Sequence, residues 1–508
     1  MKHYTSKIIT ALIFTFTIGI NLVPLYSKEI IGAWDKNVGA LNPHLYSPNQ
    51  MYAQIMVYEP LVKYENGKFV GGIAKEWKIN NNGRTYIFTI NDNLHFSNGN
   101  KLDAYAIEAN FKAILDNKTR HSWLGLTDKI KSAKAIDENT FELTLNSPYI
   151  ATLNELSLPR PFRIIDPNSM INGSTKNGIK SPIGSGAWVL EESILGIKDV
   201  FIPNPYYHKK TEISKLTMKI IPDPNSRILA LKSGGVDILV GKEMISRESF
   251  KTLQKDTKYT LTKSIPQGTF NIVINSKTID DINIRKAIIL TINKDEIWDK
   301  ILLRIDKKAE NLFQRDLEFC DIELAKQEFN LEKSKDILKN TSYNNEAIKL
   351  VYIANNPVQK SIAQSIQNEA IKVGLNIQID ASEPISFYQK QKNGDFDLIF
   401  NETWGNPFDP HSFISSMLIP SHADYAAQDG LSNKEEIREI IKTILNTNDT
   451  KKIQEQYKVL LNLLNNSNIY IPISYGVVLG VFNNRKIEFY KSGDMEHEFR
   501  FEDIKLRK

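Results

Sequence analysis

The stretch IKLVYIANNPVQKSIAQSIQNEAIKVGLNIQI (348–379) decides the fold of this chain. It opens with an apolar run at 348–354, in which Lys349 is the one charged residue, and such a run is typical of a buried strand. Pro357 then starts a helical pattern that ends at Gly374. The apolar residues of that pattern share one face: Val358, Ile362, Ile366, Ala370 and Val373. An alternating strand at 375–379 completes a β-α-β unit. Because a helix connects its two strands, we expect them to run parallel in one sheet.

Strands dominate the chain before this unit. The alternating segments 84–90 and 140–145 predict strands, and Asp103 is placed to cap the helix that follows it. After the unit come a strand at 395–401 and helices at 433–446 and 450–465. The segment IYIPISY near the C-terminus then predicts a late strand. We therefore expect an α/β protein with two lobes, whose C-terminus crosses back to the first lobe and forms a hinge.

The composition is that of a globular protein with ample core. The chain has 508 residues, of which 41% are hydrophobic and 24% charged, and its formal charge is +5. Acidic and basic residues are interspersed, so we expect no nucleic-acid partner. The one cysteine, Cys320, allows no internal disulfide and is interpreted as a buried or incidental thiol. No G-x-S-x-G or H-E-x-x-H pattern is present, and we expect no enzyme activity.

The first 27 residues predict a secretory signal rather than part of the fold. Lys2 and Lys7 precede an apolar run from Ile8 to Val23, and small or turn residues end at Ser27. We expect cleavage after Ser27; an uncleaved anchor helix is the alternative. Since no cysteine directly follows Ser27, we expect no lipid anchor and a free periplasmic protein.

Four ordered motifs resemble the periplasmic peptide- and nickel-binding proteins of ABC importers. They are YEPLVKYENGKFVGGIAKEWKINNNGRTYIFTINDNLHFSNGNKLDA (58–104), SPIGSGAWVL (181–190), IPDPNSRILALKSGGVDI (221–238) and IRKAIILTINKDEI (284–297). Within that family, further segments resemble the nickel-binding members: 37–64, LDNKTRHSW (115–123), LPRPFRI (158–164) and TWGNPFDPHSFISSMLIPSHADY (403–425).

This resemblance implies a two-lobed Venus-flytrap fold of the large peptide/nickel-binding type, with mixed sheets and a hinge. We expect lobe I at 28–265, lobe II at 266–472 and a C-terminal return to lobe I at 473–508. The implied function is capture of nickel, as a complex with histidine or a polycarboxylate metallophore, in the cleft between the lobes. The implied partner is an ABC permease in the inner membrane, and we expect a monomer.

The residues themselves favour a metal that is already bound to a small chelator over a site in which the protein supplies all the ligands. No histidines pair at the i, i+4 spacing, and no His/Cys cluster of the zinc type is present. Arginine suits the carboxylates of a chelator because its planar fork binds them in a bidentate manner. By resemblance, Arg160 holds the chelator and Arg120 supports it. The resemblance also assigns the walls of the pocket: Tyr46, Met51, Trp123, Trp404 and Phe408.

Three histidines are the candidate metal ligands. The resemblance assigns His422 as a direct ligand. His497 falls in the returning segment near the cleft, and His44 lies two residues from Tyr46. We interpret His411 as a structural residue at a helix start, and His95, His121 and His208 as structural or surface residues. Neutral imidazole binds metal, so we expect affinity to fall below a pH of about 6.5.

Other ligands remain open at this point. A di- or oligopeptide-binding protein of the same family needs an acid for the peptide amine, and Asp409 is the candidate. A haem-binding protein is a further alternative. Binding of nickel with histidine, compared with binding of dipeptides, discriminates between these readings.

Overall fold

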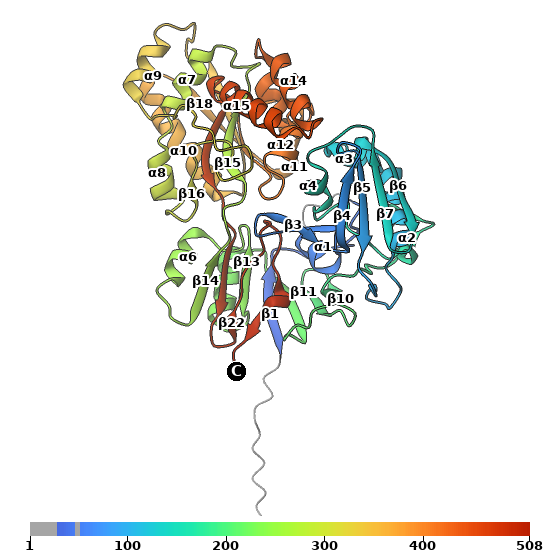
Figure 1. Ribbon diagram of the computed structural model, residues 1–508. Helices are drawn as coiled ribbons and strands as arrows, with labels where there is room; N and C mark the ends of the chain where they lie inside the picture. Colours follow the sequence, from blue (N-terminus) through green and yellow to red (C-terminus); the bar gives the residue numbers. More distant parts are fainter. Residues whose placement is uncertain (1–27, 46–50) are drawn as a thin grey trace, which may run out of the picture.

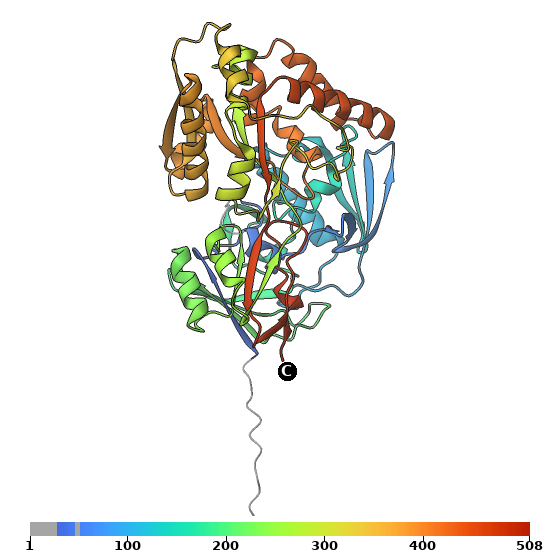
Figure 2. The same cartoon turned by 90° about the vertical axis from the view of Figure 1, so that its left-hand side faces the viewer.

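Two mixed β-sheets, one above the other in Figures 1 and 2, form the centres of two lobes. The computed structural model describes residues 28–45 and 51–508. The lower sheet has seven strands, in the spatial order β10 (Trp188–Ile194), β11 (Lys198–Pro203), β12 (Lys215–Ile220), β1 (Glu29–Trp34), β13 (Ile238–Gly241), β21 (Leu479–Asn483) and β14 (Tyr259–Lys263). Strand β1 is parallel to β12 and β13, and the other pairings are antiparallel.

The upper sheet contains the predicted β-α-β unit. Its order is β16 (Lys307–Lys308), β20 (Tyr470–Tyr475), β15 (Thr269–Ile274), β19 (Leu398–Glu402), β17 (Ala347–Ile353) and β18 (Asn376–Ser382). Strands β17 and β18 are parallel and are joined by α10 (Pro357–Ala370), as the sequence predicts. The αL conformation that ends this helical segment falls on Gly374, with φ +88°. Because β19 is also parallel to β17, the carboxyl ends of both strands meet at one sheet edge.

A third, antiparallel sheet lies beside the upper lobe (Figure 1). It has the order β4 (Ala74–Asn80), β5 (Thr85–Ile90), β7 (Thr140–Leu145) and β6 (Ile130–Asp137). Helix α2 (Ala104–Asp116) packs on it, and Asp103 caps that helix by accepting a hydrogen bond from the backbone N–H of Ala106 at 3.0 Å, as predicted. The hydrophobic core of this sheet is continuous with α14 (Lys434–Leu445) and α15 (Thr450–Asn466) of the upper lobe.

The chain crosses between the two large sheets at two adjacent segments. One crossing, 264–268, joins β14 to β15, and the other, 476–478, joins β20 to β21. Backbone hydrogen bonds tie the crossings together: Gln267 donates to Gly476 at 2.7 Å, and Gly476 donates to Gly268 at 3.0 Å. The late strand therefore returns to the first sheet. Two short, paired connections of this kind are the usual construction of a hinge.

Other elements complete the lobes. The helices are α1 (Met51–Val57), α3 (Gly125–Lys129), α4 (Thr152–Leu156), α5 (Pro224–Lys232), α6 (Arg247–Leu253), α7 (Ile282–Leu290), α8 (Lys294–Glu296), α9 (Leu331–Leu338), α11 (Pro384–Asn393), α12 (His411–Ser416) and α13 (Ala423–Asp429). The hairpins are β2 (Val62–Glu65) with β3 (Lys68–Gly71), β8 (Met170–Ile171) with β9 (Ser174–Ile179), and β22 (Ile487–Phe489) with β23 (Lys505–Leu506). Within residues 28–45 and 51–508, no helix has both the length and the apolarity that a membrane crossing requires.

Two sequence-based expectations are not decided by this fold. The predicted signal, residues 1–27, lies outside the described residues. The lobe boundaries at 265 and 472 stay predictions, although sheet membership changes from the lower to the upper sheet between β14 and β15.

Candidate ligand-binding site

Flat rings from two parts of the chain meet at Trp404, just beyond the end of β19. The Trp404 ring centroid lies 5.6 Å from that of Trp123, at an interplanar angle of 79°. It also lies 6.2 Å from the imidazole of His422. Trp123 comes from the segment before α3, beside the third sheet, whereas Trp404 and His422 belong to the upper lobe. These three predicted site residues are thus brought together where the segment before α3 meets the upper lobe, on the core that the two share.

The loop that carries Trp404 is held by its own polar groups. The carboxylate of Asp409 accepts hydrogen bonds from the Thr403 hydroxyl and from the backbone N–H of Trp404. Gly405 has φ +72°, and a Cβ on Gly268 would meet the Thr403 carbonyl oxygen at 2.3 Å. Glycine at both positions lets the crossing segment and the loop approach each other closely. The indole is therefore presented on a fixed backbone.

His422 stands at the N-cap position of α13, with its side chain partly buried. Within the part of the chain that the structure describes, neither ring nitrogen has a hydrogen-bond partner. Burial lowers the pKa of His422 to about 4. The imidazole is therefore neutral at pH 7, which is the form that binds a metal. Burial moves the protonation of His422 below the value of an ordinary histidine on which we based the expected loss of affinity near pH 6.5, and that loss stays a prediction.

The first turn of α13 is anchored to the upper sheet. Asp424, which is 2% exposed, accepts hydrogen bonds from Asn401 of β19 at 3.1 Å and from the hydroxyl of Tyr470 of β20 at 3.0 Å. Since His422 precedes this turn by one residue, its position follows from the sheet rather than from a free loop.

Arg160 is buried, and its charge acts on two histidines. It is 4% exposed, in the predicted motif 158–164. Burial, and then the charge of Arg160, lower the pKa of His121 to about 4. Burial also lowers the pKa of His497, with further contributions from Lys242 and Arg160, against the opposing charge of Glu496. Burial therefore favours the neutral form of both imidazoles, with a smaller contribution from the guanidinium, and a buried cation of this kind favours an anionic ligand.

His44 does not fit the predicted role of metal ligand. It is fully buried, and both ring nitrogens are engaged: Nδ1 lies 3.0 Å from the Thr175 hydroxyl, and Nε2 lies 3.2 Å from the Arg163 carbonyl oxygen. Arg163 is itself structural, because it donates to the carbonyls of Leu158 and Tyr58. We therefore remove His44 from the candidate ligands.

The remaining predicted site residues are placed less decisively. Phe408 is 9% exposed and packs in the large core that spans the third sheet and the upper lobe. Arg120 is exposed beside His121. Met51 begins α1. The next residue, Tyr52, stacks on Phe499 with the two ring centroids 5.5 Å apart, and Phe499 is two positions after His497 in the sequence. Tyr46 lies outside the described residues. The supporting role of Arg120 and the wall roles of Phe408, Met51 and Tyr46 stay predictions.

Other sequence interpretations can be compared with the structure directly. His411 begins α12, as predicted, and its Nδ1 lies 2.9 Å from the Tyr457 hydroxyl. Cys320 is a buried free thiol, and burial raises its pKa. His121, interpreted as structural or surface, is buried, and the charge of Arg160 acts on it. Its place between Arg120 and Trp123 in one short motif is the signal that was available.

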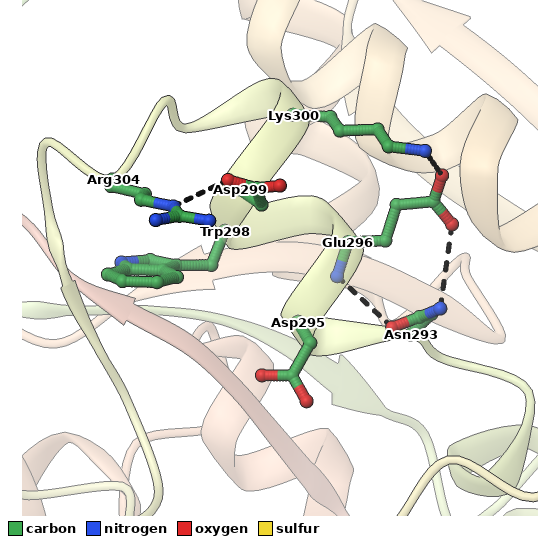
Figure 3. A pocket seen from close by; sticks show the side chains of 7 residues that line it. All are labelled: Asn293, Asp295, Glu296, Trp298, Asp299, Lys300 and Arg304. Carbon is green, nitrogen blue, oxygen red and sulfur yellow. Dashed lines mark hydrogen bonds and ion pairs between the residues drawn. The ribbon is translucent and has the colours of Figure 1, made fainter.

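Metal donors do not converge into a cage within the described residues. No group of three or more His, Cys, Asp or Glu side chains is arranged there to hold an ion. A surface hollow of about 440 Å³ on α8 and the following turn contains acidic residues (Figure 3). Its three carboxylates are already paired: Glu296 with Lys300 at 2.7 Å, Asp299 with Arg304 at 2.5 Å, and Asp295 with Lys308 outside the hollow. The hollow also lies on the far side of the upper lobe from α12 (Figure 1).

Two lobes joined by two paired crossings, with Trp123, Trp404 and His422 brought together beyond the carboxyl end of β19, are features of a two-lobed ligand-binding protein. The chain belongs to the bacterial extracellular solute-binding proteins, family 5, whose model matches residues 68–425. This confirms the resemblance seen in the sequence motifs.

Three relatives place the chain within that family. The nickel-binding periplasmic protein of Escherichia coli (strain K12) is 38% identical, over 94% of each chain. The crystal structure of NikA from Brucella suis in complex with Fe(III)-EDTA has a TM-score of 0.91 and 37% identity, and the match covers 94% of this chain and 100% of that one. The dipeptide-binding protein of Escherichia coli (strain K12) is 21% identical, over 87% of this chain and 89% of its own.

Proposed function

We propose that this protein is the substrate-binding component of an ABC importer and captures nickel as a complex with a small anionic chelator, histidine or a polycarboxylate. The observation that carries the proposal is the cluster of Trp123, Trp404 and His422. It offers two flat apolar walls and a neutral imidazole whose ring nitrogens have no hydrogen-bond partner among the described residues. Both named relatives at 37–38% identity, a nickel-binding protein and a protein bound to a metal chelate, support the same ligand class.

Each group has a distinct role in this proposal. Arg160 pairs with the carboxylates of the chelator, and the indoles cover its faces. His422 supplies one nitrogen to the metal, and His497 is the candidate for a second. Most donors come from the chelator, since three or more protein donors do not converge within residues 28–45 and 51–508. Nickel accepts such nitrogen and oxygen ligands.

Peptide binding is less favoured by the geometry of Asp409. Both of its oxygens accept hydrogen bonds within its own loop, and burial raises its pKa to about 7. A group that is about half protonated at pH 7 and already bonded is a poor partner for a peptide amine. We also propose that the protein works in the periplasm as a monomer after removal of residues 1–27, and delivers its cargo to an inner-membrane permease without catalysing a reaction.

Calorimetry on residues 28–508 tests this proposal. Nickel with an excess of L-histidine should bind at one site, whereas dipeptides or haem should not bind there. His422→Gln should weaken binding, and His208→Gln is the matched control because His208 is exposed and lies against Tyr207. Uptake of dipeptides with no uptake of nickel–histidine would overturn the proposal.

A further inference from the structure

The loop after β13 reaches from the lower lobe to the upper lobe. Lys242 forms an ion pair with Glu402, at the carboxyl end of β19. The next residue, Glu243, accepts a hydrogen bond at 2.9 Å from the side-chain amide of Asn356, the N-cap of α10. Both contacts are made at the carboxyl edge of the upper sheet. They join residues that are more than a hundred positions apart, from the loop after a strand of the lower sheet to the edge of the upper sheet.

The backbone of this loop is shaped to present those two side chains. Gly241 ends β13 with φ +132°, and a Cβ there would meet Cγ of Met244 at 2.9 Å. Glu243 follows in the left-handed region, with φ +60°. A non-glycine residue in that region carries a conformational cost of order 1 kcal/mol, so contacts elsewhere must hold it in place. Its bond to Asn356 of the upper lobe is one such contact.

Lys242 also has a partner in the returning segment. Its ammonium lies 3.2 Å from a carboxylate oxygen of Glu496. Arg500 connects that segment to the hairpin of β2 and β3 through an ion pair with Glu65 at 3.3 Å. One lysine therefore neutralises two carboxylates that face each other, Glu402 above and Glu496 below. Without the lysine, the two lobes would present like charges to each other.

We propose that Lys242 is a clasp between the lobes: it sets ligand affinity by stabilising the closed form, without contacting the ligand. This inference rests on the proposed function for the identity of the ligand, whereas the stabilisation of the closed form by Lys242 does not depend on which ligand is bound. The ligand enters the open cleft and is retained while the lobes stay closed, so the overall affinity rises with the stability of the closed form relative to the open form. Breaking the Lys242–Glu402 pair lowers the closed population, and the ligand then escapes faster.

Matched variants separate the bond that crosses between the lobes from the one that does not. Glu402→Gln removes the cross-lobe pair and leaves Lys242 with Glu496, and it should weaken nickel–histidine binding about two- to fivefold. Lys242→Ala should weaken it more, about tenfold, because two carboxylates then face each other. Glu496→Gln should leave binding within about twofold. Glu192→Gln breaks a 2.6 Å ion pair with Lys198 inside the lower sheet and is the control.

Two measurements make the proposal refutable. In stopped-flow kinetics, the loss for Glu402→Gln and Lys242→Ala should appear in the dissociation rate, and it should shrink in 1 M salt. In small-angle X-ray scattering without ligand, Lys242→Ala should have a larger radius of gyration than the wild type, and Lys242→Arg should restore the wild-type value. Unchanged scattering, or a loss confined to the association rate, would overturn the clasp. A protein that binds no nickel–histidine would overturn the proposed function alone, since the scattering comparison needs no ligand.

Discussion

Replacement of His422 by glutamine is the sharpest test of the site, because the structure predicts both the size and the pH dependence of its effect. Glutamine keeps a polar side chain of similar length but removes the imidazole nitrogen. Groups that only support a metal ligand typically contribute 10–100-fold in affinity, so loss of a direct ligand should reach the upper end, about 100-fold or ~2.7 kcal/mol. The assay is calorimetry with nickel and excess L-histidine, for wild type and variant at the same pH.

The pH dependence follows from the environment of His422. Burial lowers its pKa to about 4, so about 90% of the imidazole is still neutral at pH 5. An ordinary histidine with a pKa near 6.5 would be only about 3% neutral at that pH. The ratio of wild-type to variant affinity cancels the acid sensitivity of the chelate itself. This ratio should stay nearly constant from pH 7.5 to pH 5 and decline only near pH 4.

Two results would refute this reasoning. A ratio near one at pH 7.5 would mean that His422 does not bind the metal. A ratio that falls about 30-fold between pH 7.5 and pH 5 would mean that its imidazole titrates as an exposed one does.

Three further predictions concern buried cations and histidines. Arg160→Lys keeps the charge but loses the planar fork, and it should weaken binding of the anionic chelate about tenfold in calorimetry, with no change in the urea midpoint. His44→Ala leaves groups of Thr175 and Arg163 without partners in a closed core, and should lower the free energy of unfolding by about 3–5 kcal/mol in urea titration while nickel–histidine affinity stays within about twofold. Burial lowers the pKa of His44 to about 3 and that of His121 to about 4, so the unfolded chain binds more protons than the folded protein below pH 6.5. The urea midpoint should therefore decrease as the pH is lowered from 6.5 to 4. His121→Gln should make this decrease with pH smaller.

Local patterns predicted much of the fold. Strand β7 has its predicted bounds, and α10 starts at Pro357 as expected, because a proline start and a one-sided apolar pattern depend only on neighbouring residues. The helices predicted at 433–446 and 450–465 appear as α14 and α15, with bounds that differ by one residue. The core shared by the third sheet and these helices was not predictable, since it depends on contacts between distant parts of the chain.

The candidate site also has features that the sequence predicted and features that only the structure shows. The motifs that contain Arg160, Trp404 and His422 stand out in the sequence, and the structure brings Trp404 and His422 together. The sequence did not show that both nitrogens of His44 are taken by Thr175 and the Arg163 carbonyl. It also did not show that burial moves the protonation of His422 to low pH. Hydrogen-bond partners and dehydration are set by residues that are far away along the chain.

The sequence by itself determined the family, the β-α-β unit and the choice of aromatic, imidazole and guanidinium groups, because periodicity and short motifs are properties of adjacent residues. Only the tertiary structure decided which histidines keep their nitrogens available, and that Lys242 and Glu402 meet between the lobes. The physical reason is that burial and charge pairing are sums over everything within a few ångströms, and most of those neighbours come from other sheets.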